Sequence, residues 1–168
     1  MDPIGRTEPS RVAGERESLT GFLDYQRETL EMKCAGLSAG QLRAQAVAPS
    51  GMSLLGLVRH LAEVERGWFR NGMNGEEAPS YWGRLPDGGF AEFTVDEADP
   101  DEAFAVWREA CARSRAIVDA APSLDVLGHY EEDEFTLRYV LTHMIEEYAR
   151  HNGHADLLRE NIDGSTGE

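Results

Sequence analysis

The stretch that decides the fold is residues 136–160, which read TLRYVLTHMIEEYARHNGHADLLRE. Its apolar residues recur with the period of an α-helix, and it holds three of the five histidines of the chain. At about 100° per residue, four titratable side chains share an arc of roughly 80°. They are His143, Glu147, His151 and His154, and their arc overlaps the edge of the apolar face. Titratable groups at such an edge are costly unless they are paired or bound to a metal, so the stretch predicts a polar or metal site there.

Three more segments are amphipathic with the same period. Residues 11–36 and 53–70 each carry a stripe of apolar side chains, and residues 99–121 do the same. Ser53, Asp99 and Thr136 stand where N-caps are expected, and Pro100 is suited to a first helical turn. No segment alternates with the period of a strand. The sequence therefore predicts an all-α fold, a four-helix bundle.

The stretch 71–99, between the second and third helices, is too long for an ordinary bundle loop. It contains glycines, prolines and four scattered aromatic side chains, and it shows no helical period. Two interpretations stay open at this point. The stretch is either a functional, lid-like loop or a crossover between two helices that run parallel, with its aromatic side chains packed on the bundle. We expect one domain over residues 11–164, with residues 1–10 and 165–168 as flexible termini.

Composition and charge exclude several classes of function. The chain has 168 residues, 41% of them hydrophobic, and a formal net charge of −15. Nucleic acid is not expected as a partner, since it binds basic surfaces, and the same charge argues against an anionic membrane surface. The sequence shows neither a membrane span nor a signal peptide, so we expect a cytoplasmic protein. Cys34 and Cys111 fall at helical core positions and are expected to be reduced.

The titratable side chains indicate a metal site. Glu147 and His151 are one helical turn apart and can point at one ion, and His60 is the histidine placed to complete the set from the second helix. Two histidines and one carboxylate leave open positions on zinc or a similar divalent ion. The alternative is a core in which these side chains hydrogen-bond to one another.

Gly56, one turn before His60, would allow another group to come close. Glu65 points into the apolar arc, where an arginine or a backbone cap is its expected partner.

Two segments together resemble a known family. SLLGLVRHLAEVERGWF (residues 53–69) and HMIEEYARHNGHADLLRE (residues 143–160) are similar to the DinB-like superfamily of four-helix metalloproteins. The closer likeness is to its branch with the mycothiol-dependent maleylpyruvate isomerase, and it covers about residues 11–164. The resemblance implies His60, Glu147 and His151 as the metal ligands. Many members of the superfamily have a second histidine at the position of Glu147, and the isomerase-like branch has a glutamate there.

The remaining polar side chains near this stretch are secondary candidates. His154 is either an outer partner or substrate contact, or a surface histidine near a helix C-terminus. His143 either lines the pocket or packs at its edge. Arg159 is a candidate contact for an anionic substrate, although pairing with carboxylates is the alternative for it and for Arg150. His129 is expected at the surface. No catalytic side chain is identified beyond the metal-bound thiol or water that such a site implies.

The resemblance and the ligand set lead to two hypotheses about function. The first is a metal-dependent S-transferase or isomerase that activates a low-molecular-weight thiol of the mycothiol type against a small electrophile. Zinc is the expected ion and nickel the alternative; hydrolysis by metal-bound water is a further variant. The second hypothesis is a non-catalytic, stress-related bundle that binds a metal or a small molecule. A small-molecule substrate is the expected partner, and a homodimer is a further expectation.

Overall fold

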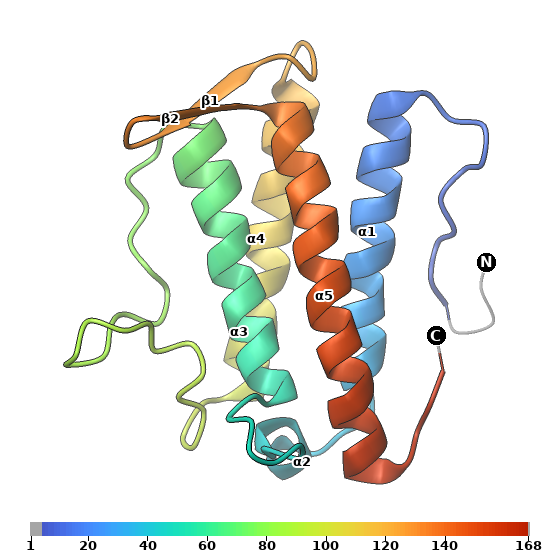
Figure 1. The fold of residues 1–168 in the computed structure, drawn as a ribbon, viewed down its shortest axis with the longest axis vertical. Helices are drawn as coiled ribbons and strands as arrows, with labels where there is room; N and C mark the ends of the chain where they lie inside the picture. Colours follow the sequence, from blue (N-terminus) through green and yellow to red (C-terminus); the bar gives the residue numbers. More distant parts are fainter. Residues whose placement is uncertain (1–4, 168) are drawn as a thin grey trace.

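A computed structural model describes residues 5–167 and shows a bundle of four long helices (Figure 1). This architecture confirms the predicted all-α bundle. Of the termini expected to be flexible, residues 1–4 and 168 lie outside the described residues. The described part of the N-terminal segment packs on the first helix, where the buried Arg6 side chain donates to Thr29 Oγ1 at 3.1 Å. In chain order the elements are α1 (Glu15–Cys34), α2 (Ala39–Arg43), α3 (Leu54–Glu65), η1 (Arg66–Met73), α4 (Pro100–Ala120), β1 (Leu127–Tyr130), β2 (Asp133–Thr136) and α5 (Leu137–Asp163).

The ends of the helices follow the capping residues of the sequence. The hydroxyl of Ser53 accepts from the backbone N–H of Gly56 at 3.1 Å and begins α3. The side chains of Asp99 and Thr136 cap α4 and α5 in the same way. Gly164 ends α5 with φ 79°, a left-handed conformation that a residue without a Cβ adopts at low cost. Each cap satisfies backbone groups that the helix itself leaves open.

The four long helices form two pairs, and the two helices of each pair run parallel. Chain direction in Figure 1 shows α1 and α5 running one way and α3 and α4 the other. Because α3 and α4 are consecutive and parallel, the chain has to return along the whole bundle between them, which is the crossover interpretation of residues 71–99. Arg43 of α2 fixes the end of this crossover by donating through Nε to the carbonyl of Ala98 at 3.0 Å. None of the described helices is long and apolar enough to cross a membrane.

Two local features differ from the sequence expectation. The second helix does not end near Arg70 but widens into the π-helix η1, in which the N–H of Asn74 reaches the carbonyl of Phe69 at 2.9 Å. The connector before α5 forms an antiparallel hairpin of β1 and β2, each four residues long. Strands this short carry too few residues to show an alternating period. The hairpin lies against η1 so closely that a Cβ on Gly128 would come within 2.7 Å of the carbonyl oxygen of Gly72.

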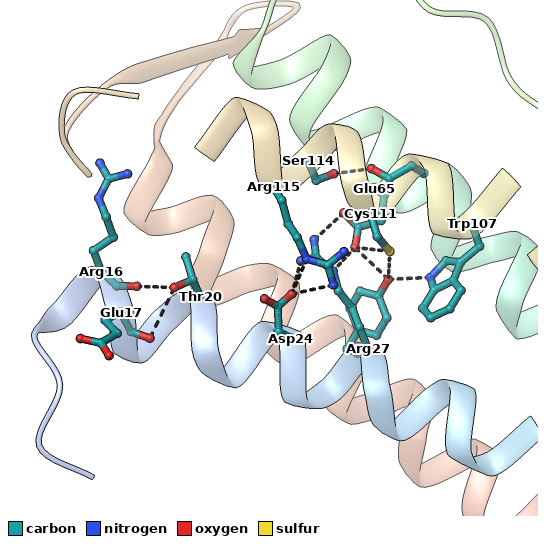
Figure 2. A network of polar contacts seen from close by, with 12 residues as sticks. Arg16, Glu17, Thr20, Asp24, Arg27, Glu65, Trp107, Cys111, Ser114 and Arg115 are labelled. Carbon is teal, nitrogen blue, oxygen red and sulfur yellow. Dashed lines mark hydrogen bonds and ion pairs between the residues drawn. The ribbon is translucent and has the colours of Figure 1, made fainter. Parts of the chain in front are cut away.

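A buried polar network joins all four long helices in the core (Figure 2). Glu65 of α3 accepts two hydrogen bonds of 2.8 Å from Arg27 of α1 and one of 2.8 Å from the hydroxyl of Tyr148 of α5. Cys111 of α4 lies with its sulfur 3.6 Å from the same carboxylate. Burial opposes the charge of Glu65, but Arg27 and the hydroxyls of Ser114 and Tyr148 hold its pKa below the usual value. The expected arginine partner of Glu65 is therefore confirmed.

The two cysteines are free and buried. Cys34 lies near the end of α1, and burial raises the pKa of its thiol to about 12. Burial, and next the nearby negative charge of Glu65, raise the pKa of the Cys111 thiol as well. Both thiols are thus protonated and reduced, as the sequence predicts, but Cys111 also lies within the polar network around Glu65 and does not pack as a hydrophobic group alone.

Candidate metal centre

Three side chains from two helices meet at the seam between α3 and α5. His60 Nε2 lies 3.1 Å from Glu147 Oε1, and His151 Nε2 lies 3.2 Å from the same oxygen. One ligand atom from each residue can be chosen so that all three lie within 4.8 Å of one another. The structure thus brings together the three side chains that the sequence singled out as ligands.

Helix packing explains why these three side chains converge. Glu147 and His151 share one face of α5 because they are four residues apart. Their neighbours Met144 and Tyr148 are fully buried, which fixes the rotation of α5 about its axis and places the Glu147 face against α3. His60 lies on the half-buried edge of α3 that faces it. All three side chains are partly exposed, so one side of the cluster is open to an incoming group.

The protonation states suit a cation. Burial opposes ionisation of Glu147, but the hydrogen bond from His60 and the charges of His151 and His60 hold its pKa below the usual value. Burial, and next the charge of His60, lower the pKa of His151. Two imidazole nitrogens and a carboxylate oxygen match the donor set of open zinc and related divalent sites. The residues present therefore fit a divalent metal ion.

Each histidine of this trio has a second partner on its other ring nitrogen. His60 Nδ1 lies 3.3 Å from Glu92 Oε1, and His151 Nδ1 lies 3.3 Å from His154 Nδ1. His154 is therefore in contact with the cluster and not with solvent alone. Glu92 was not singled out by the sequence, because it comes from the crossover and has no fixed spacing to any other member. The only local signal is its position between two aromatic residues, in the tetrapeptide FAEF.

The crossover also covers the histidine of α3 with an aromatic ring. Phe93 stacks on His60 with ring centroids 5.4 Å apart and an interplanar angle of 29°. The ring passes over Gly56, where a Cβ would lie 2.7 Å from Phe93 Cδ1. This is the close approach that the glycine one turn before His60 suggested. Residues 71–99 thus form the crossover that was one of the two interpretations, and they also form a wall of the site.

Other predicted side chains lie apart from the trio. His143 faces Trp68 at a ring distance of 4.6 Å and stacks on Tyr139 at 6.2 Å. Arg159, two turns beyond His151, pairs with Asp163 at 2.8 Å and donates to backbone carbonyls at the end of α1. Its pairing follows the alternative that the sequence left open. His129 is exposed on β1, as expected.

An open cavity of about 1030 Å³ lies beside η1, apart from the trio. It is bounded by η1, the crossover and the β-hairpin, and the rings of Trp68 and Tyr139 in its wall also contact His143. The trio itself does not line this cavity. No local pattern in the sequence indicates this cavity, because its walls come from segments far apart in the chain.

The family model described as mycothiol-S-transferase matches residues 18–164, which is most of the chain. This match confirms the predicted resemblance to mycothiol-related enzymes of the DinB-like superfamily. No curated protein matches the sequence significantly.

Proposed function

The chain belongs to the mycothiol-S-transferase family, and on that premise we propose that it joins a low-molecular-weight thiol, through its sulfur, to a small electrophile. The reaction depends on a divalent metal ion held by His60, Glu147 and His151. The observation that carries this proposal is the convergence of their three donor atoms within 4.8 Å at the open side of a seam between two helices. Zinc suits this donor set, and nickel, which imidazole also binds well, is the alternative.

The chemistry requires a thiolate at neutral pH. A divalent ion supplies this by lowering the pKa of a thiol bound to it. The protein side chains hold the ion in place: the carboxylate of Glu147 contributes the negative charge, and the two imidazoles contribute neutral donors. In the transfer a carbon–sulfur bond forms, the bond to the leaving group of the electrophile breaks, and the thiol proton and the leaving group are released to solvent.

The proposal is tested by turnover with defined metal content. Protein reconstituted with one zinc ion per chain is mixed with mycothiol and 1-chloro-2,4-dinitrobenzene, and the products are identified by mass. We expect a thioether that contains the whole thiol, formed at a rate that falls to background after chelation and returns when zinc is added. Glutathione in place of mycothiol tests the preference for the thiol.

Two results would contradict the proposal. If the protein binds zinc but forms no product with a range of electrophiles, the non-catalytic bundle is the better account. If a substrate is rearranged and the thiol is recovered unchanged, the reaction is an isomerisation and not an S-transfer. Product formation that survives complete removal of the metal would exclude a role of the ion in activating the thiol.

A further inference from the structure

The exposed hydrophobic side chains of the described residues gather at one place. Of the seven large ones that are exposed, four line the cavity beside η1: Phe90, Leu127, Tyr130 and Tyr139. They come from the crossover, from strand β1 and from the first turn of α5. An apolar surface that converges on a concave site marks a ligand pocket more often than scattered exposed residues do.

The polar side chains of this cavity are largely occupied by the protein itself. Asn71 forms two hydrogen bonds with the backbone of Ala78, of 3.2 and 3.0 Å. Arg66 pairs with Glu63 at 2.7 Å and donates to the carbonyl of Ala78 at 2.6 Å. Ser80 also donates to Glu63, at 2.7 Å. The wall also includes the charged side chains of Arg84, Asp133 and Glu134. Its apolar part consists of ring faces and an aliphatic side chain, which favour a planar apolar molecule over a polyhydroxylated one.

A row of rings connects the cavity with the candidate metal centre. Trp68 lies at the cavity, contacts Phe135 at a ring distance of 5.1 Å and contacts His143 at 4.6 Å. Tyr139 stacks on the same histidine with an interplanar angle of 5°. His143 precedes Glu147 by one helical turn, about 5.4 Å along α5. His143 thus links two rings of the cavity wall to the helical turn that carries Glu147.

From these contacts we propose that the cavity binds the electrophilic substrate and that this substrate is an aromatic or similarly planar, apolar compound. The assignment of the ligand as the electrophile rests on the proposed S-transfer. The binding itself does not, because the cavity is separate from the metal ligands. Binding can therefore be measured on protein that contains neither metal nor thiol, and its failure is distinct from a failure of the proposed reaction.

The probe for this test is 2,4-dinitroaniline, an aromatic compound that quenches tryptophan fluorescence and has no leaving group. We expect it to bind metal-free protein at one site and to quench Trp68, so that Trp68→Phe keeps binding by equilibrium dialysis but loses most of the quenching. Tyr139→Ala is expected to weaken binding about tenfold or more. The matched control is Phe22→Ala, which removes an equally exposed ring from α1, and glucose should not displace the probe.

Three outcomes would overturn the proposal. The first is equal affinity of the probe for the wild-type protein and Tyr139→Ala, and the second is no binding at all. The third is a dimer in sedimentation that Tyr139→Ala turns into a monomer, because a second copy of the chain would then cover this face.

A second inference concerns Glu92, which the crossover carries into the bundle. Its carboxylate is buried, with 6% of the residue exposed, and Oε1 lies 3.3 Å from His60 Nδ1. Its other oxygen, Oε2, is buried with no hydrogen-bond partner. A buried carboxylate with one orphaned oxygen costs stability, so Glu92 is poorly suited to a purely structural role. The arginine Arg59, which interacts electrostatically with it, offsets part of that cost.

The two nitrogens of His60 have different partners, and this fixes the role of the ring. Nε2 points to Glu147 in the trio, and Nδ1 points to Glu92. When Nε2 binds an ion, the remaining N–H of the ring is on Nδ1, and the Glu92 carboxylate is placed to accept it and to hold the ring in that orientation. Phe93, the next residue, stacks on the same ring and limits its rotation. We infer that Glu92 is a positioning residue for the metal ligand His60, acting through the tautomer and the orientation of its ring.

The test is zinc affinity, measured by competition with a chromophoric chelator. Glu92→Ala is expected to weaken zinc binding about 10–100-fold, the range typical of outer partners of metal ligands. Glu92→Gln keeps an oxygen that accepts from Nδ1–H and is expected to recover part of that loss. The control is Glu97→Ala, which removes the same charge from an exposed position five residues further along the crossover. The absorption spectrum of the cobalt-substituted protein should change in Glu92→Ala and not in the control.

A structural role of Glu92 would give a different pattern. On our inference, the melting temperature of the metal-free protein is unchanged or raised in Glu92→Ala, because the substitution removes the orphaned oxygen. A fall in the melting temperature of the metal-free protein, with zinc affinity and the cobalt spectrum equal to those of Glu97→Ala, would overturn it.

Discussion

Replacing His151 with alanine is expected to abolish stoichiometric metal binding while the bundle still folds. The substitution removes one of three donors that lie within 4.8 Å of one another, so the loss in affinity should exceed the roughly 10–100-fold loss typical of an outer partner. The fold should survive, because His151 is half-buried at the seam and contributes no side chain to the apolar core. The measurement is the metal content of tag-free protein by elemental analysis, with circular dichroism as the check on folding.

The matched controls are two other histidines of the same chain. His129→Ala removes an exposed side chain on the hairpin, and His143→Ala removes one on α5 that contacts the cavity wall instead of the trio. Both variants are expected to keep about one ion per chain. A His151→Ala protein that keeps the full metal content, or a loss confined to His143→Ala, would mean that the ion is held by a different part of the α5 face.

The same variant gives a second measurement through stability. An ion that binds only the folded chain stabilises it by about 2.7 kcal/mol when its free concentration is 100 times its Kd. Adding zinc should therefore raise the melting temperature of the wild-type protein, and a chelator should lower it again. The melting temperature of His151→Ala should respond to neither. A metal-independent melting temperature in the wild-type protein would argue for the hydrogen-bonded core instead of a metal site.

Arg27→Met is expected to cause the largest loss of stability, about 3–5 kcal/mol in the free energy of unfolding. Arg27 and Glu65 are both buried, with 4% and 0% of their side chains exposed, and their atoms are 2.8 Å apart. Without the guanidinium, the carboxylate stays buried with only the hydroxyls of Tyr148 and Ser114 and the weaker Cys111 thiol around it. The measurement is urea unfolding of the metal-free protein, so that loss of an ion does not contribute to the result.

Two further variants separate the contribution of the ion pair from the cost of leaving one buried charge without a partner. The double substitution Arg27→Met, Glu65→Met removes both charges and is expected to recover most of the loss, since an apolar pair of similar volume is often as stable as a buried ion pair. The control is Arg113→Ala, which breaks an exposed pair with Glu109 and should cost about 0.3–0.5 kcal/mol. A loss below about 1 kcal/mol in Arg27→Met would show that the buried carboxylate is easily satisfied by other groups.

The Arg27–Glu65 pair also predicts how the stability of the protein depends on pH. The pKa of Glu65 in the folded protein is held below its usual value, so the unfolded chain takes up a proton first as the solution becomes acidic. The stability that Glu65 contributes is therefore fully present above the ordinary carboxyl range and is lost as the pH falls through its folded pKa. The double variant should lose less stability on acidification than the wild-type protein does.

Much of the fold was determined by local signals in the sequence. The apolar period placed four helices, and the hydroxyl and carboxylate caps Ser53, Asp99 and Thr136 set where three of them begin. These signals act within one or two turns, so they are visible without knowledge of the partners of each helix. The π-helix and the four-residue strands were missed, because neither leaves a periodic pattern and both depend on packing against each other.

The sequence by itself determined which side chains can share one helical face, since the spacing of Glu147 and His151 follows from the geometry of any α-helix. It also indicated that Glu65 needs a partner, an arginine or a backbone cap, because a carboxylate in an apolar arc is costly without one. Only the tertiary structure decided which members of the histidine stripe meet His60. The burial of Met144 and Tyr148 sets the rotation of α5, and that rotation turns Glu147 and His151 to α3 while His143 faces Trp68. The partners of the two histidines and the walls of the aromatic cavity come from distant segments, so they exist only once the crossover and the hairpin have packed on the bundle.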